Sequence, residues 1–190
     1  FTFRYKAGPK LLWMRTFHEY YNPQMAIYVL KELLKKYPNV KLSMAGQDKG
    51  LLKKIKDLVI QLGLEKAVHF LGFLEDIEKP KIFLQHDIFI NTNQVDNMPV
   101  TLLEVAAFGL PIVATNVGGI PYIFTHKETA LLVPDKDVNA MVSAIIQLIE
   151  NPNLVKYLSK NARKLAEKFN FSITIPLWEE AFDYVLKFKK

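Results

Sequence analysis

Short apolar segments and longer amphipathic segments alternate along the first two thirds of the chain. Each apolar segment has the length and composition of a buried strand, and each amphipathic segment repeats apolar residues at helical spacing. The predicted strands cover residues 11–15, 40–45, 67–71, 87–91, 112–114 and 129–133, and the predicted helices cover residues 23–37, 52–62, 76–85 and 99–108. Strands that alternate with helices form right-handed crossovers and a parallel sheet. The sequence therefore predicts an α/β fold, a Rossmann-like doubly wound parallel sheet of about six strands with helices on both faces.

Beyond the last predicted strand the pattern is helical only. Three further helices are predicted over residues 138–149, 154–169 and 172–188, the last carrying Trp178, Phe182 and Val185. A chain of 190 residues, half of them hydrophobic, is long enough for one substantial core. We therefore predict a single domain over residues 1–190.

The junction between the fourth strand and the next helix carries the strongest functional signal. Asn97 is a candidate cap, Pro99 suits the first turn of a helix, and Gly109 with Pro111 ends that helix. Its predicted apolar face consists of Val100, Leu103, Ala106 and Ala107. A helix N-terminus that follows a polar loop presents free N–H groups and attracts anions. This junction is a candidate anion site.

Two carboxylates, Asp96 and Glu104, flank this candidate site eight residues apart. A carboxylate in so apolar a helix is costly unless it faces solvent or a ligand. Glu104 lies either on an exposed edge of the helix or against a ligand. In the second interpretation both acids accept hydrogen bonds from ligand hydroxyls, with ligand phosphates between them.

The same stretch resembles the Glu-x7-Glu signature of retaining glycosyltransferases of family 4, the glycosyl transferases group 1. Asp96 and Glu104 match its two acids, and the match continues through Phe108-Gly109-Leu110-Pro111-Ile112-Val113-Ala114-Thr115 and Asn116-Val117-Gly118-Gly119-Ile120-Pro121. The first acid is Asp here instead of Glu, which keeps the charge and removes one methylene. The resemblance covers nearly the whole chain.

The resemblance implies the donor-binding, C-terminal half of a GT-B enzyme, with the N-terminal acceptor domain absent from this chain. Such an enzyme transfers a sugar from a nucleotide diphosphate sugar to an acceptor hydroxyl with retention, without a cofactor or metal. By resemblance Asp96, Glu104 and Arg15 are the catalytic residues: Arg15 stabilises the diphosphate, Glu104 holds the ribose, and Asp96 holds the sugar. The implied donor-binding residues are Gly46, Gly72, Phe73, Leu74, Asn97, Met98, Pro99, Val100 and Thr101.

Arg15 ends the first strand, where a guanidinium could bind a diphosphate bidentately or form a surface salt bridge. The resemblance favours the ligand. Relatives usually place a Lys five residues later, where this chain has Tyr20. The second phosphate cation is therefore missing or supplied from elsewhere, with Lys49 and His18 as candidates.

Glycines follow the second and third strands. Gly46 allows close approach of a ligand to the backbone, and the segment from Gly72 resembles the part of the family that holds the nucleotide base. Phe73 either packs in the core or forms a wall for the base. The pair Gly118-Gly119 either caps the next helix or turns tightly beside the sugar, and Tyr122 stands where relatives often carry an acid.

Other motifs argue against rival chemistries. Asp135 and Asp137 spell an Asp-x-Asp, but Asp137 is better placed to cap the helix from Val138 than to bind a metal. The chain contains no Gly-x-Gly-x-x-Gly after a strand, which argues against a dinucleotide dehydrogenase. No metal is expected.

Composition leaves two further alternatives open. The net charge is +6, and its lysines scatter over polar helix faces, so a solvated surface is favoured over a basic nucleic-acid-binding domain. The other alternative is a module that binds a nucleotide sugar without turnover. The chain has no cysteine, no apolar run near 20 residues and no signal peptide, and it lacks an initial Met. We expect an excised piece of a cytoplasmic enzyme of cell-envelope polysaccharide biosynthesis, which meets a lipid-linked acceptor at the inner membrane face and is inactive alone.

Overall fold

The computed structural model describes residues 3–187. Its centre is a parallel sheet with the strand order β3-β2-β1-β4-β5-β6. The strands are β1 (Lys10–Met14), β2 (Lys41–Ala45), β3 (Val68–Gly72), β4 (Ile88–Asn91), β5 (Ile112–Thr115) and β6 (Leu131–Val133). The order reverses beside β1, so that β1 and β4 are neighbours, as in a doubly wound fold. The predicted α/β sheet is confirmed.

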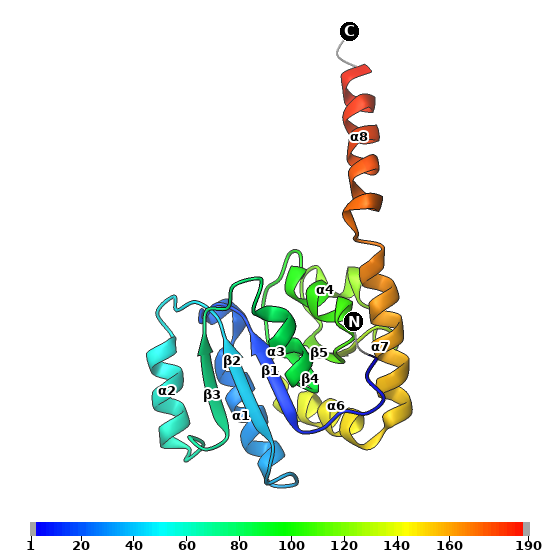
Figure 1. The fold of residues 1–190 in the computed structure, drawn as a ribbon. Helices are drawn as coiled ribbons and strands as arrows, with labels where there is room; N and C mark the ends of the chain where they lie inside the picture. Colours follow the sequence, from blue (N-terminus) through cyan, green and yellow to red (C-terminus); the bar gives the residue numbers. More distant parts are fainter. Residues whose placement is uncertain (1–2, 188–190) are drawn as a thin grey trace.

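Helices cover both faces of this sheet (Figure 1). They are α1 (Pro23–Leu34), α2 (Leu52–Gln61), α3 (Lys79–Gln85), α4 (Val100–Ala107), α5 (Ile120–Ile123), α6 (Val138–Glu150), α7 (Pro152–Glu167) and α8 (Phe171–Lys187), with a 3-10 turn η1 (Glu19–Tyr21). The 3-10 turn was not predicted, and α5 was predicted only as one of two alternatives for the segment after Gly118-Gly119.

Alternating side chains of the strands feed two hydrophobic cores. Leu11 and Trp13 of β1 lie in the core that includes residues of α1, α2 and α6. Leu12 and Met14 lie in the second core, with residues of α3 and α4. Successive side chains of a strand point to opposite faces, so a run that is buried on both faces is apolar throughout. This explains why β1 has an almost continuous apolar sequence.

The start of α4 differs from the prediction. The helix begins at Val100, and Pro99 is its N-cap, with φ −80° and ψ 65°. The predicted cap Asn97 is wrong, because the Pro99 carbonyl accepts the first backbone hydrogen bonds of the helix, from Leu102 (2.9 Å) and Leu103 (3.2 Å). Pro99 therefore precedes the helix instead of occupying its first turn.

The buried face of α4 also differs. It consists of Leu102, Val105 and Ala106, whereas Val100 is 54% exposed. The predicted face was wrong for Val100 and correct for Ala106. The orientation follows from packing, since α4 lies between the sheet and α7.

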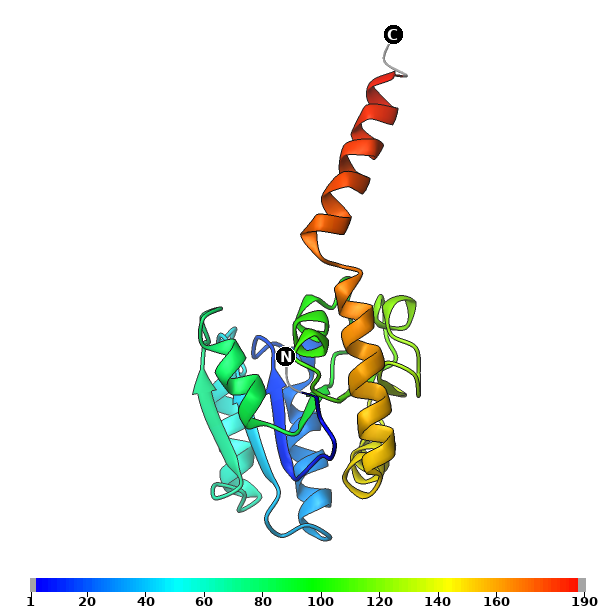
Figure 2. The same cartoon turned by 45° about the vertical axis from the view of Figure 1, so that its right-hand side comes forward.

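The last helix stands apart from the sheet and its covering helices. Helix α8 projects away from the rest of the molecule in both views (Figures 1 and 2). None of its described residues is buried, and the predicted Trp178, Phe182 and Val185 are all more than half exposed. The predicted final residue of this helix, Phe188, lies outside the described residues. Among the described helices, none reaches both the length and the apolar character of a membrane span.

Candidate functional site

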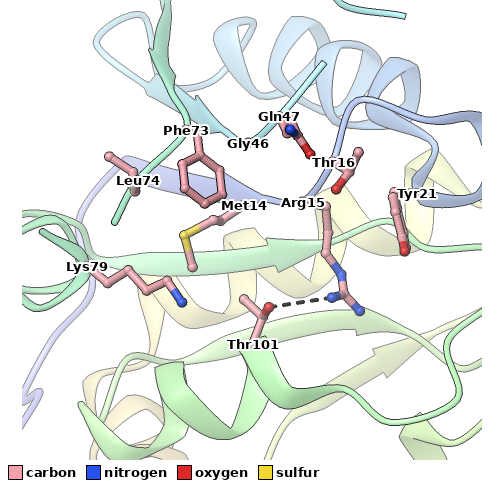
Figure 3. Close-up of a pocket in the computed structure, with 10 residues that line it drawn as sticks. All are labelled: Met14, Arg15, Thr16, Tyr21, Gly46, Gln47, Phe73, Leu74, Lys79 and Thr101. Carbon is pink, nitrogen blue, oxygen red and sulfur yellow. Dashed lines mark hydrogen bonds between the residues drawn. The ribbon is translucent and has the colours of Figure 1, made fainter. Parts of the chain in front are cut away.

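A cavity opens at the carboxyl ends of the central strands (Figure 3). Its lining comes from the ends of β1 to β3, from the loops that follow them, and from the starts of α3 and α4. The lining residues are Met14, Arg15, Thr16, Tyr21, Gly46, Gln47, Phe73, Leu74, Lys79 and Thr101. Ligands of open α/β sheets bind at this edge, beside the point where the strand order reverses. One of the cavities of the structure therefore lies at the predicted location.

Arg15 follows β1 directly and is held by three neighbours. Its Nη2 forms an ion pair with Asp96, and its Nη1 donates to Thr101 Oγ1 at 3.5 Å. The guanidinium carbon lies 4.9 Å from the centre of the Tyr21 ring, a cation–π distance. The Nε group is buried and has no hydrogen-bond partner among the described residues. Arg15 is thus fixed in place, and two of its five N–H donors are used by these contacts.

Asp96 lies beneath this arginine, and its side chain is only 4% exposed. Besides Arg15, Asn93 Nδ2 donates to its Oδ2 at 2.7 Å. Its backbone carbonyl accepts from the N–H of Gly119 at 2.6 Å. The sequence placed Asp96 in the loop after β4 correctly, but it did not predict the ion pair with Arg15.

Lys79 is a site residue that the sequence analysis missed. Its Nζ lies 3.1 Å from Glu104 Oε1, 3.3 Å from Oε2 and 2.8 Å from Asp76 Oδ1. Burial lowers the pKa of Lys79, but the hydrogen bonds and charges of Asp76 and Glu104 outweigh it, so the pKa is raised. The sequence did contain one signal for Lys79. It lies in the first turn of α3, where the helix macrodipole disfavours a cation, so a lysine there suggests a nearby anionic partner.

Glu104 lies on α4 with its side chain 33% exposed, and it faces Lys79. Glu104 is not among the residues that line the cavity, but it contacts Lys79, which does line it. The first interpretation made from the sequence agrees with the structure, because the carboxylate is on a partly exposed edge of the helix. Whether it binds a ribose stays a prediction.

Gly46 brings three strand ends together. It has φ 145°, and its N–H donates to the Gly72 carbonyl at 2.7 Å. A Cβ at this position would overlap the carbonyl of Arg15, so only glycine fits. Phe73, which follows Gly72, is 63% exposed and lines the cavity, whereas Leu74 is buried. The structure thus favours a cavity wall over the core for Phe73.

A second cavity adjoins the first and shares Arg15 and Tyr21 with it. Its lining residues are Arg15, Tyr20, Tyr21, Val95, Asp96, Asn97 and Met98. Tyr20 is 56% exposed, so an aromatic ring stands where a phosphate-binding Lys was expected by resemblance. Of the residues predicted at the start of α4, Thr101 lines the first cavity, whereas Pro99 and Val100 line neither.

The two cations proposed from the sequence to replace that Lys do not line these cavities. The His18 ring caps η1, where its Nδ1 accepts from the N–H of Tyr20 at 3.3 Å. Lys49 lies in the loop after β2, where its N–H donates to the Phe17 carbonyl. Lys79 is the second cation of the first cavity.

Thr92 connects the site to the core. Its hydroxyl accepts from Trp13 Nε1 at 2.9 Å and lies 2.8 Å from the Tyr21 carbonyl and 2.9 Å from the Asn22 carbonyl, to which it donates. Trp13 and Thr92 are both fully buried. One hydroxyl therefore joins β1, the loop after β4 and the loop that carries Tyr21.

The Gly118-Gly119 pair packs directly against the Asp96 loop. A Cβ on Gly118 would overlap the Asp96 carbonyl oxygen, and one on Gly119 would overlap the Asn97 carbonyl oxygen. Gly119 is also the residue before α5, so the tight turn and the helix start predicted as alternatives are both present. Tyr122 is 91% exposed.

The Asp-x-Asp motif has a structural role at its second acid. Asp137 Oδ1 accepts from the N–H of Ala140 at 2.8 Å, so the predicted cap of α6 is confirmed. Over residues 3–187, no cluster of three or more His, Cys, Asp or Glu could hold a metal ion. Independence from metal stays a prediction.

Comparisons with known proteins agree with this architecture. Residues 2–165 match the family described as glycosyl transferases group 1. An uncharacterized glycosyltransferase of Haemophilus influenzae is 30% identical over 158 residues, which are 80% of this chain and 43% of that protein. The chain thus spans less than half of that relative.

Solved structures show the same fold. Anabaena HepE, in complex with UDP and glucose, superposes with a TM-score of 0.83 at 21% identity, over 92% of this chain and 48% of HepE. The C-terminal domain of the group 1 protein LpcC from Francisella tularensis superposes with a TM-score of 0.75 at 24% identity, over 86% of this chain and 87% of that one. The fold is that of the C-terminal domain of GT-B glycosyltransferases. By its sequence match, this chain belongs to the glycosyl transferases group 1.

Proposed function

We propose that this chain is the donor-binding domain of a retaining, family 4 glycosyltransferase that uses a nucleotide diphosphate sugar. The observation that supports it most directly is the pair of cations in one strand-end cavity. Arg15 and Lys79 both line that cavity together with Thr101, from the first turn of α4 (Figure 3). Two cations and a helix N-terminus favour a ligand with two phosphates.

In this proposal the diphosphate lies against Arg15 and the start of α4. Lys79 supplies the second cation to the diphosphate. The nucleoside lies against the wall formed by Phe73 and Leu74, with its ribose hydroxyls reaching Glu104. Glu104 is partly exposed and its carboxylate is already hydrogen-bonded to Lys79, so its oxygens are held in a position open to ligand hydroxyls. The UDP named in the HepE complex supports a nucleoside diphosphate as ligand.

The proposed reaction needs no protein nucleophile. An acceptor hydroxyl forms a bond to the anomeric carbon while the bond from that carbon to the diphosphate oxygen breaks. The hydroxyl proton passes to the departing diphosphate, and Arg15 stabilises the charge that develops there. The acceptor would be bound by a domain outside this chain. We therefore propose that this chain alone binds donors without transferring sugar. We also propose that the acceptor is a lipid-linked molecule of cell-envelope polysaccharide biosynthesis.

One observation favours a second candidate, a module that binds a nucleotide sugar without turnover. Tyr20 stands where the resemblance expects a phosphate-binding Lys. Lys79, the other cation of the cavity, lies beside Glu104 at the start of α3 instead. If departure of the diphosphate requires the missing cation, the chain still binds the nucleotide sugar but the sugar is not transferred.

The test measures binding of UDP and UDP-glucose by calorimetry, with Lys79→Met compared with Lys81→Met. Lys81 lies on the same helix and is exposed. Removing a charge-assisted contact should weaken UDP binding about tenfold or more in Lys79→Met only. Addition of EDTA should leave the affinity unchanged. Absence of binding by the wild type to any nucleoside diphosphate would overturn the proposal. Turnover by the full-length protein then separates an enzyme from a binding module.

A further inference from the structure

The carboxylate of Asp96 is largely buried at the edge of the second cavity, and both of its donors reach the same oxygen, Oδ2. Its side chain is 4% exposed, and its donors are Arg15 Nη2 and Asn93 Nδ2. The backbone cannot easily carry this carboxylate outward, because Gly118 and Gly119 press against the Asp96 and Asn97 carbonyls. A side chain that is buried and already hydrogen-bonded is poorly placed to accept hydrogen bonds from a sugar.

Arg15, in contrast, stands between the two cavities and lines both. An arginine side chain has many rotamers, and fixing one of them costs conformational entropy. Asp96 engages Nη2, and the Tyr21 ring lies against the guanidinium. Figure 3 shows Nη1 directed toward Thr101. These contacts leave Nη1 on the side of α4 and Nε without a partner among the described residues. The guanidinium is held before any ligand arrives.

We propose that Asp96 is a positioning residue, which fixes the Arg15 guanidinium for the diphosphate and does not contact the sugar. This inference rests on the proposed function, because it takes the diphosphate to lie at Arg15. It assigns the two acids of the motif to different tasks: Glu104 lies beside the crevice, in contact with Lys79, and Asp96 acts through Arg15. A pre-oriented guanidinium loses less entropy when it binds a diphosphate.

The test compares three probes, UMP, UDP and UDP-glucose, on the wild type and on Asp96→Asn. The ratio of UDP to UMP affinity reports the second phosphate, and the ratio of UDP-glucose to UDP affinity reports the sugar. We expect Asp96→Asn to lower the UDP-to-UMP ratio about tenfold, the low end for a hydrogen bond to a charged group. The UDP-glucose-to-UDP ratio should stay as in the wild type. Asp57→Asn, an exposed change on α2, serves as the matched control.

A double mutant separates positioning from a general structural effect. If Asp96 acts through Arg15, Asp96→Asn should not lower the UDP-to-UMP ratio further in an Arg15→Gln background. Loss confined to the UDP-glucose-to-UDP ratio would overturn the inference and return Asp96 to the sugar. Equal loss for all three probes would overturn it as well, because a merely structural role weakens every ligand alike.

Should Asp96→Asn fail to fold, Tyr21→Leu gives the same test, because it removes the ring that lies against the guanidinium. The UDP-to-UMP ratio should fall while the sugar ratio is kept, and an unchanged UDP-to-UMP ratio would overturn the inference. Wild-type protein that binds no UDP would instead overturn the proposed function.

Discussion

The Glu104 side chain is partly exposed, and its carboxylate pairs with one cation among the described residues, Lys79. Lys79 contacts both of its oxygens, and the side chain is 33% exposed. We expect Glu104→Gln to weaken binding of UDP and of UDP-glucose by a similar factor, about tenfold to a hundredfold. The reason is the loss of a charge-assisted contact to the ribose.

Titration calorimetry with both ligands checks this expectation. Glu65→Gln, an exposed change at the opposite end of the sheet before β3, is the matched control. A loss seen only with UDP-glucose would place Glu104 at the sugar and contradict the assignment.

His86 makes the stability of the fold depend on pH. Its Nδ1 lies 2.7 Å from the Ile82 carbonyl, to which it donates, and its Nε2 accepts from the Ser43 hydroxyl at 2.8 Å. Burial lowers the pKa of His86, and the hydrogen bond to Ile82 opposes this shift only in part. The unfolded chain, with a His pKa of about 6.5, therefore binds the proton more readily than the folded one. The contribution of His86 is present above that pH and is lost as the pH falls below it.

Urea unfolding at pH 7.5 and pH 5.5 should show this loss in the wild type. It should be smaller in His86→Leu, which has no proton to bind. His69→Gln, a change at an exposed histidine of β3, should keep the wild-type pH dependence. The same pH dependence in His86→Leu and the wild type would show that other groups cause it.

At the scale of elements, the turn before α5 supports the loop after β4. Gly119 has an ordinary φ of −77°, so a side chain there is excluded by contact and not by backbone strain. We expect Gly119→Ala to cost about 1–3 kcal/mol of stability, as overpacking does, and to weaken UDP binding because the Asp96 loop must shift.

Gly63→Ala is a useful comparison. Gly63 lies in the turn between α2 and β3 with φ 68° and open space around it, so this change costs stability through backbone strain only. UDP affinity should remain at the wild-type value in this variant. Normal UDP affinity in Gly119→Ala would mean that the turn does not support the site.

The strands and most helices could be predicted because their signals are local. A short apolar run bounded by polar residues specifies a buried strand wherever it lies, and Ala26, Val29, Leu30 and Leu33 mark the buried face of α1 at helical spacing. The face of α4 was harder to predict, because nearly every position of that helix is apolar. Its orientation is set by contact with α7, which no short window of sequence contains.

The side-chain pairs of the site could not be predicted for the same reason. Arg15 and Asp96 are 81 positions apart, and Lys79 and Glu104 are 25 apart. Each residue was visible in the sequence, but its partner depends on which loops the sheet brings together. The parallel topology predicts that strand ends converge, and it does not predict which charges meet there.

At the scale of the whole molecule, α8 contributes nothing to the core. Its described residues are unburied, whereas Ser159 and Ala162 of α7 are fully or almost fully buried. We therefore expect removal of residues 171–190 to leave the melting temperature and UDP affinity close to those of the intact chain. Removal from residue 151 onward, which takes α7 as well, should abolish cooperative unfolding.

Thermal melting followed by circular dichroism checks both deletions. The longer deletion takes away α7 side chains that hold α4, since Ser159 donates to the Gly109 carbonyl at 2.7 Å and Arg163 bonds the Ala107 carbonyl. A large drop in melting temperature for the shorter deletion would mean that α8 does stabilise the domain.

The single hydroxyl of Thr92 has a consequence for motion. Because it joins the Trp13 indole to the Tyr21 carbonyl, the loop that carries Tyr21 and the loop after β4 cannot separate without breaking a hydrogen bond of the buried Thr92 side chain. Loops that carry binding residues usually open far more often than the core. Here the amide protons beside Thr92 should exchange with deuterium only as fast as those of β1. The loop after β4 would then open only when the core opens.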